Sequence, residues 1–233
     1  MRYIYLLLIL CCFSCNNERV LLLPEIENAE IIEVLDVSPA YIFYDETQPD
    51  STLLNRKNLI STTNWLVNVD KRLTLKQAIP HIKFLQDKKR NAKMHKNEDA
   101  KNYFTCNDTG IGSLGFVEFT EIMYQEKIEI DTIYHKNNLP TEENLKRMAG
   151  FHASSTIPII FNGAEQVKID SVTLDFDNLE NELNKFTELN FIGIHIQIYF
   201  DKNLSFQDYI SIKRKIQSFK SDLISVDFNE YIF

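Results

Sequence analysis

The C-terminal stretch that decides the fold reads Ile196-Gln-Ile-Tyr-Phe-Asp-Lys-Asn-Leu-Ser-Phe206, followed by a helical run and then by Leu223-Ile-Ser-Val-Asp-Phe-Asn-Glu-Tyr-Ile-Phe233. Isoleucines alternate with polar or aromatic residues in its first part, which is typical of a strand with one buried face. Ser205 is suited to cap the helix, and an acidic residue three positions later completes a capping-box pattern. The stretch therefore predicts a strand, a turn, a helix and a second strand.

The same unit occurs earlier in the chain, in a looser form. One block of residues near position 70 matches a block near position 201, and a second block near 119 matches one near 228. The positions that define this repeat are Asp70, Leu73, Thr74 and Phe119 in the first copy and Asp201, Leu204, Ser205 and Phe228 in the second. Two ordered blocks favour an internal duplication over the alternative, a chance likeness between two β-α-β units.

The repeat and the length of the chain together predict the fold class. A chain of 233 residues exceeds the ~100–150 residues of a typical single domain. We expect an α+β protein of two related small units, each a mixed or antiparallel sheet with helices packed on one face. The predicted boundaries are 31–130 for the first unit and 131–233 for the second.

The first residues have the pattern of a secretory signal. Arg2 supplies a positive charge, and Tyr3–Phe13 is a continuous apolar run, shorter than the ~20 residues that cross a bilayer. The run ends in Cys12-Phe-Ser-Cys15. A small residue before a cysteine at this point resembles the lipobox of bacterial lipoproteins.

In that family the signal is removed by signal peptidase II and the cysteine becomes the acylated first residue. The resemblance implies a signal peptide at 1–14, lipidation (palmitate) at Cys15 and a lipidated tether at 15–30. The alternative is an ordinary signal peptide with incidental cysteines. The expected location is the envelope of a Gram-negative bacterium, at the outer membrane facing the periplasm.

Charge and cysteine content argue against several classes of function. The net charge is -8, and the sequence shows no basic patch, which argues against binding of nucleic acid and against peripheral binding to anionic lipid. Of the four cysteines, only Cys106 lies beyond the signal and the proposed lipidation site. We expect Cys106 to be a small buried hydrophobic residue and not a reactive thiol.

The final third of the chain carries a second resemblance. Residues 157–233 read as strand, turn, strand, helix, strand, helix and strand, with Val172-Thr-Leu-Asp175 before the first helix and Asp201 at the end of a strand. This order resembles the periplasmic domain of the ExbD/TolR family, the non-channel partners of proton-driven envelope motors. The resemblance implies a protein-interaction module that contacts envelope proteins or peptidoglycan, and a possible homodimer. Because the apolar run contains no aspartate, motor activity is not implied.

No pattern in the sequence indicates a catalytic, cofactor or metal site. The glycines at 110, 112 and 115 precede a predicted strand, so we interpret them as a turn and not as a dinucleotide loop. The histidines lack metal-ligand spacing. We expect His195 to be exposed, and Glu230 to lie on a solvated strand face. The preferred function is a non-enzymatic scaffold, and the alternative is an envelope hydrolase that uses His152, Ser154 or Ser155.

Overall fold

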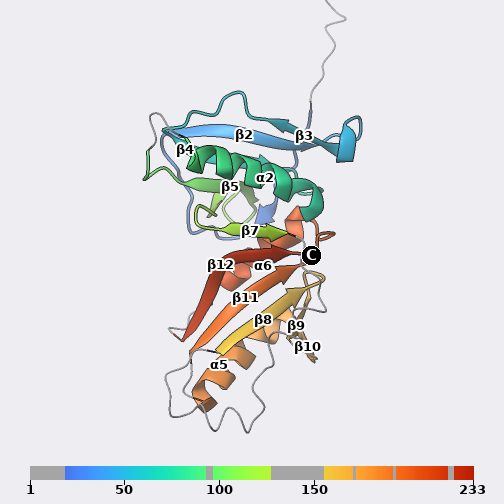
Figure 1. Cartoon of the computed structure of the whole chain (residues 1–233), viewed down its shortest axis with the longest axis vertical. Coiled ribbons are helices and arrows are strands. Elements are labelled where there is room, and N and C mark those ends of the chain that lie inside the picture. Colours follow the sequence, from blue (N-terminus) through green and yellow to red (C-terminus); the bar gives the residue numbers. More distant parts are fainter. Residues whose placement is uncertain (1–18, 93–96, 127–154, 170–171, 191–192, 220–222) are drawn as a thin grey trace, which may run out of the picture.

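The computed structural model describes residues 19–92, 97–126, 155–169, 172–190, 193–219 and 223–233. Within them, two mixed sheets of six strands each follow one another along the long axis of the molecule, with helices packed against them (Figure 1). The predicted class, α+β with two sheet-based units, is confirmed.

The first sheet is formed by the strands between residues 25 and 118, and the same segment includes one long helix. Its elements are β1 (Glu25–Ile26), β2 (Val37–Tyr44), the 3-10 turn η1 (Pro49–Ser51), β3 (Thr52–Asn55), β4 (Asn64–Val69), α2 (Leu75–Arg90), β5 (Asn102–Asp108) and β6 (Ser113–Glu118). β2, β4 and β5 run parallel, while β3 pairs antiparallel with β2 and β6 pairs antiparallel with β5. Trp65, Val67 and Val69 of β4 are buried, as their alternation predicts.

The second sheet has the order β10-β9-β8-β11-β12-β7. Its elements are β7 (Met123–Glu126), β8 (Ser155–Phe161), β9 (Gln166–Ile169), β10 (Val172–Asp175), the 3-10 turn η2 (Phe176–Asn178), α5 (Leu179–Asn190), β11 (Ile194–Phe200), α6 (Phe206–Gln217) and β12 (Ile224–Ile232). β8, β11, β12 and β7 run parallel, whereas β9 and β10 form antiparallel hairpins.

The two sheets share a common arrangement of strands. The order β3-β2-β4-β5 in the first sheet has the same directions as β9-β8-β11-β12 in the second. In each case a helix, α2 or α6, connects the last two parallel strands. The second unit adds β10 and α5 before β11. In this match β4 is equivalent to β11 and α2 is equivalent to α6, as the first block of the sequence repeat requires.

The second block of the repeat does not survive in the structure. The strand equivalent to β12 is β5, since both run parallel to the preceding strand, whereas β6 before Phe119 is antiparallel. Phe119 is 2% exposed and Phe228 is 63% exposed. The two phenylalanines are therefore not equivalent, and pairing them was wrong. A short apolar motif can match any strand, and strand direction cannot be read from it.

Part of the segment predicted as a tether, 15–30, packs against the first sheet. Its residues 22–29, which we call the N-terminal arm, include β1, which lies parallel to the end of β5. The amide of Asn107 donates to the carbonyl of Pro24 at 2.8 Å. A two-residue strand of this kind satisfies the hydrogen bonds of backbone groups. It is too short to leave a periodic pattern in the sequence. The arm therefore belongs to the first sheet.

The predicted boundary at residue 130 does not separate the two sheets, because β7 lies before it and belongs to the second sheet. This strand lies within the segment assigned to the first unit, but it pairs with β12, with Tyr124 opposite Glu230. It covers the edge of the second sheet, which would otherwise present unpaired backbone groups. The first part of the chain thus completes the sheet of the second.

The units meet at the strand–helix turns that carry the first repeat block. Thr74 and Ser205 form an isolated antiparallel bridge. Both residues also cap a helix: the Gln77 side chain accepts from the amide of Thr74 at 2.9 Å, and the Ser205 hydroxyl accepts from the amide of Asp208 at 3.1 Å. The capping pattern expected at Ser205 is confirmed.

Hydrogen bonds around this bridge are reciprocal. The amide of Leu75 donates to the carbonyl of Leu204 at 2.9 Å, and the amide of Phe206 donates to the carbonyl of Leu73 at 2.7 Å. Because Leu73 matches Leu204 and Leu75 matches Phe206 in the repeat, each bond is the copy of the other. Reciprocal contacts between equivalent residues define a local two-fold axis.

The hydrophobic core runs through both units without interruption. At the junction, Phe104 of β5 stacks on Phe119 with ring centroids 3.8 Å apart. The same Phe104 ring contacts Phe206 and Tyr209 of α6 edge-on, at 5.2 and 6.2 Å. The units are consequently joined by side-chain packing as well as by backbone bonds.

Candidate functional site

A bulge in β12 is the most distinctive feature of the second sheet. Ile196 of β11 lies opposite Val226, but Ile198 lies opposite Glu230, so β12 has two more residues than β11 over this interval. The Asp227 carboxylate accepts from the amide of Asn229 at 2.9 Å and holds the extra loop of chain. Bulges re-aim side chains and are frequent beside functional sites.

The bulge opens a small pocket between α6 and β12, which we call the α6–β12 pocket. Its volume is about 150 Å³, and its apolar lining includes Ile198, Ile216, Val226 and Phe228. Phe228 stands at the rim and is 63% exposed. A cavity of roughly 150 Å³ lined by such residues accepts a group of the size of benzene. The pocket is therefore suited to a single apolar or aromatic side chain.

The lining of the pocket also includes a buried ion pair, Lys213 with Glu230. Lys213 of α6 donates to Glu230 of β12, and the two residues are 6% and 3% exposed. The other oxygen of Glu230 accepts from the Tyr209 hydroxyl at 2.6 Å, and Tyr209 lies 2.9 Å from the Tyr124 hydroxyl of β7. Buried charges need such partners because desolvation is costly.

Burial determines which of these hydrogen-bonded side chains carry protons. Burial raises the pKa of Tyr124 and of Tyr209 well above the ordinary value, so both hydroxyls keep their protons. Since Tyr209 donates its proton to Glu230, the bond between the tyrosines is donated by Tyr124. The hydrogen-bonded series Tyr124–Tyr209–Glu230–Lys213 thus links β7, α6 and β12 around the pocket.

The sequence did not predict this site. Glu230 was expected on a solvated strand face, which is wrong, because it shares the buried face of β12 and meets Lys213. The one available signal was Lys213 itself, which falls on the apolar stripe of the helix. A lysine in that position either extends its amine to solvent or requires a buried acid.

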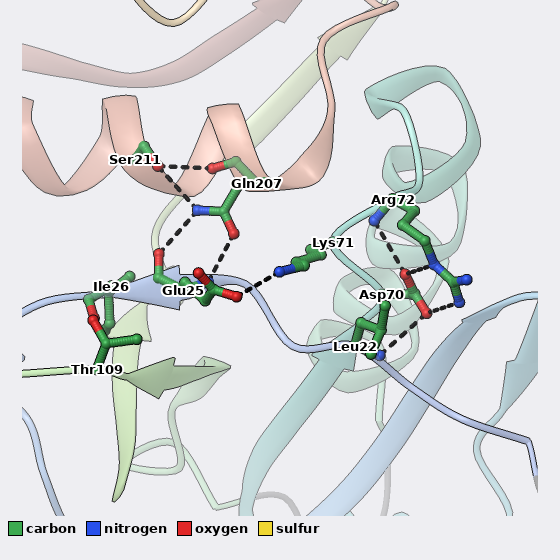
Figure 2. Close-up of polar contacts among 9 residues, drawn as sticks. All are labelled: Leu22, Glu25, Ile26, Asp70, Lys71, Arg72, Thr109, Gln207 and Ser211. Atoms are coloured by element: carbon green, nitrogen blue, oxygen red, sulfur yellow. Dashed lines mark hydrogen bonds and ion pairs between the residues drawn. The ribbon is translucent and has the colours of Figure 1, made fainter. Parts of the chain in front are cut away.

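A second group of polar contacts holds the N-terminal arm to both units. Figure 2 shows the Gln207 side chain of α6 accepting from the backbone amide of Glu25 at 2.8 Å and donating to its carbonyl at 2.9 Å. Asp70 accepts from the amide of Leu22 at 3.2 Å and from the Arg72 guanidinium. The side chain of Gln207 thus pairs with β1 as a neighbouring strand would.

Two carboxylates hold the arm, and the pKa of each is lowered. Burial raises the pKa of Asp70, but hydrogen bonds from Arg72 and from the Leu22 amide outweigh this and lower it. The pKa of Asp108 is lowered by the amide of Ala29, together with other backbone amides, among them that of Gly110. Carboxylates that accept several N–H groups favour the charged form.

We expect the arm to make the fold acid-sensitive. A carboxyl whose folded pKa is lowered stabilises the protein above its unfolded pKa of ~4, and this stabilisation is lost as the pH falls through the folded pKa. The urea midpoint should therefore drop between pH 5 and pH 3. Asp108→Asn should lower the midpoint at pH 7 and flatten the drop. Asp87→Asn, at an exposed site on α2, is the control; an equal effect of both would contradict this role.

A third cluster lies on the face of β11 and β12 opposite the core isoleucines. The His195 ring lies 3.0 Å from the Ser225 hydroxyl and 3.8 Å from the Asp227 carboxylate. His195 points away from the buried Ile194 and Ile196, but its side chain is 35% exposed, so it is only partly exposed and not exposed as expected. The Ser225 hydroxyl also contacts the Ile194 carbonyl at 3.3 Å, and 3.8 Å exceeds a hydrogen bond. These distances fit a surface polar cluster better than an activated nucleophile.

Several predicted site residues lie where the structure gives no geometry. Cys15, His152 and Ser154 are outside the described residues, and Ser155 is described only as the first residue of β8. Asp70 and Asp201, the paired turn residues of the repeat, follow β4 and β11. Asp201 accepts from the amide of Asn203 at 2.7 Å and so stabilises its turn.

Cys106 is buried in β5, which confirms its expected role as a small hydrophobic residue. Burial raises the pKa of its thiol to about 12. We predict that iodoacetamide at pH 8 leaves the native protein unmodified at Cys106 and modifies it fully in urea, measured by intact mass. Rapid labelling of the native protein would show that β5 opens readily.

The described residues contain no group of three or more His, Cys, Asp or Glu side chains placed to hold a metal ion. Among the described helices, none combines the length and the apolar character needed to span a membrane. No protein-family model, curated protein or solved structure matches the chain.

Proposed function

We propose that this chain is a lipid-anchored protein of the cell envelope that acts as a non-enzymatic interaction module. Its α6–β12 pocket receives an apolar side chain of a partner protein. The observation that carries this proposal is Phe228, 63% exposed at the rim of an apolar pocket. Exposed aromatic residues beside a preformed apolar cavity are typical anchors of protein interfaces.

The rigidity of the pocket supports the same proposal. The ion pair between Lys213 and Glu230 and the bulge at Asp227 fix its walls before a partner arrives, and preorganised sites lose less entropy on binding. One buried side chain contributes roughly 1.5–3 kcal/mol. The partner must therefore make further contacts around Phe228.

The two resemblances in the sequence suggest where the partner is found. The lipobox-like Cys15 points to the envelope, and the ExbD/TolR-like order of elements points to a component of an energy-transducing transport system or to peptidoglycan. A second copy of the chain is another candidate partner. The proposed location is the outer membrane, facing the periplasm.

Anchoring and partner binding can be tested separately. Incorporation of labelled palmitate should be lost in Cys15→Ala; unchanged labelling would exclude this lipidation site. For the partner, a photo-crosslinking phenylalanine analogue is placed at Phe228 in intact cells, with the same analogue at Leu114, 46% exposed on β6, as the matched control.

We expect one discrete adduct from position 228, none of the same mass from position 114, and loss of the adduct when Val226→Phe fills the pocket. Circular dichroism would verify that Val226→Phe remains folded. Identical adducts from both positions, or an adduct that Val226→Phe leaves unchanged, would contradict docking at the pocket. Mass spectrometry of the adduct would identify the partner as an envelope protein or a second copy of the chain.

A further inference from the structure

A second hollow lies on the β2–β3 hairpin, in the opposite unit from the α6–β12 pocket. Its volume is about 610 Å³, and its lining combines Arg19, Arg56 and Lys57 with the apolar side chains of Phe43 and Leu53. We call it the β2–β3 hollow. The sequence showed no basic patch, because Arg19 is far from the other two along the chain. The fold brings the three cations together.

The three basic side chains are only partly neutralised. Arg19 pairs with Asp45 at 3.4 Å, and it is the only one of the three with an ion pair among the described residues. The Arg56 guanidinium lies 4.7 Å from the centre of the Phe84 ring, and both Arg56 and Lys57 are exposed. Arg56 and Lys57 therefore keep positive charges that no acid among the described residues pairs with, although the net charge of the protein is -8.

The lining of the hollow places apolar side chains beside the basic ones. Phe43 is half-buried and stacks on Tyr41 with ring centroids 5.8 Å apart. Phe84, which is not part of the lining, is 45% exposed beside Arg56. Long basic side chains on an aromatic floor keep their stems on apolar surface and their charges outward. Such a combination suits the boundary between phosphate headgroups and acyl chains.

The position of Arg19 in the sequence limits how far this surface can lie from a membrane that holds an acylated Cys15. Arg19 follows the proposed lipidation site, Cys15, by four residues, and four extended residues span at most ~14 Å. An acylated Cys15 therefore holds Arg19 within about 14 Å of the bilayer surface. In Figure 1, β2 and β3 form one end of the described molecule, and β8 to β10 lie toward the other.

We propose that the β2–β3 hollow rests on the membrane and binds anionic phospholipid headgroups through Arg19, Arg56 and Lys57. This inference rests on the lipid anchor proposed above. Each basic residue near an anionic surface favours contact by about fivefold. The contact orients the molecule, so that the second unit and its α6–β12 pocket point away from the bilayer that holds the anchor.

The test uses the acylated mature protein, reconstituted into vesicles of phosphatidylcholine with or without phosphatidylglycerol. An environment-sensitive dye is attached at Asn58→Cys, beside the hollow, or at Gln166→Cys on β9 as the distant control. Cys106 is buried and stays unlabelled. Quenching by spin-labelled lipid headgroups reports how close each position lies to the membrane, and flotation of the vesicles reports anchoring independently.

We expect the dye at position 58, but not at 166, to be quenched in phosphatidylglycerol vesicles. Arg56→Gln with Lys57→Gln should shift the equilibrium away from the surface by up to about 25-fold. The matched control, Lys88→Gln with Lys202→Gln, should leave quenching unchanged. High salt should weaken the contact.

Three results would overturn the proposal. They are equal quenching in pure phosphatidylcholine, quenching that persists without Arg56 and Lys57, and quenching at position 166 in place of 58. Normal flotation together with any of these would leave the anchor intact and reject only the lipid-binding surface. Failure of the protein to float would reject the anchor and this surface together.

Discussion

Glu230→Ala is expected to lower the free energy of unfolding by about 3–5 kcal/mol. The change leaves the Lys213 ammonium buried without its counter-charge and removes the acceptor of the Tyr209 hydroxyl. The measurement is urea denaturation at pH 7, followed by circular dichroism and by the fluorescence of the single tryptophan.

The control for this variant removes both charges at once. Lys213→Met with Glu230→Leu leaves no unpaired ion and should destabilise the protein less than Glu230→Ala does. If the double variant is as unstable as the single one, the buried charge is not the cause. The loss would then come from packing around the α6–β12 pocket.

Phe104→Ala is expected to lower the free energy of unfolding by about 3–5 kcal/mol. Both units should still unfold together, in a single transition with a lower midpoint. Phe104 belongs to the first unit, but its ring contacts Phe206 and Tyr209 of the second, and the cavity left by its removal lies at their junction. Calorimetry and denaturation with two probes test whether the transition stays single.

Phe84→Ala is the matched control, because Phe84 is 45% exposed and contacts Arg56 at the surface. Its cost should stay under about 1 kcal/mol. A second transition in the Phe104→Ala protein, with an unchanged midpoint, would show that the two units unfold independently. The shared core would then be a weak contact and not a structural necessity.

Local patterns predicted those parts of the fold that depend on neighbouring residues. The alternation of Ile194, Ile196 and Ile198 gave the buried face of β11, and Ser205 gave the start of α6, because burial and capping act over a few positions. The α+β class followed from the same patterns. None of these inferences required knowledge of distant contacts.

The parts that were missed depend on residues far apart in the chain. The partner of helical Lys213 is seventeen positions away on the strand β12, and the bulge that exposes Phe228 interrupts a run with regular alternation. The pairing of β7 with β12 and the meeting of Arg19 with Arg56 are equally nonlocal. Spacing along the chain carries no signal for such contacts.

The reciprocal bonds between the Leu73–Leu75 and Leu204–Phe206 turns also bear on ancestry. They are the contacts that two identical molecules would make as a homodimer, so a gene fusion would have preserved the dimer within one chain. Identical subunits must carry every surface twice, whereas fused copies can specialise. Ala78 and Ile82 occupy in the first copy the places of Tyr209 and Lys213 in the second. The first copy therefore has no counterpart of the Tyr209 hydroxyl or of the Lys213 amine, and the two units differ at the positions that support the α6–β12 pocket.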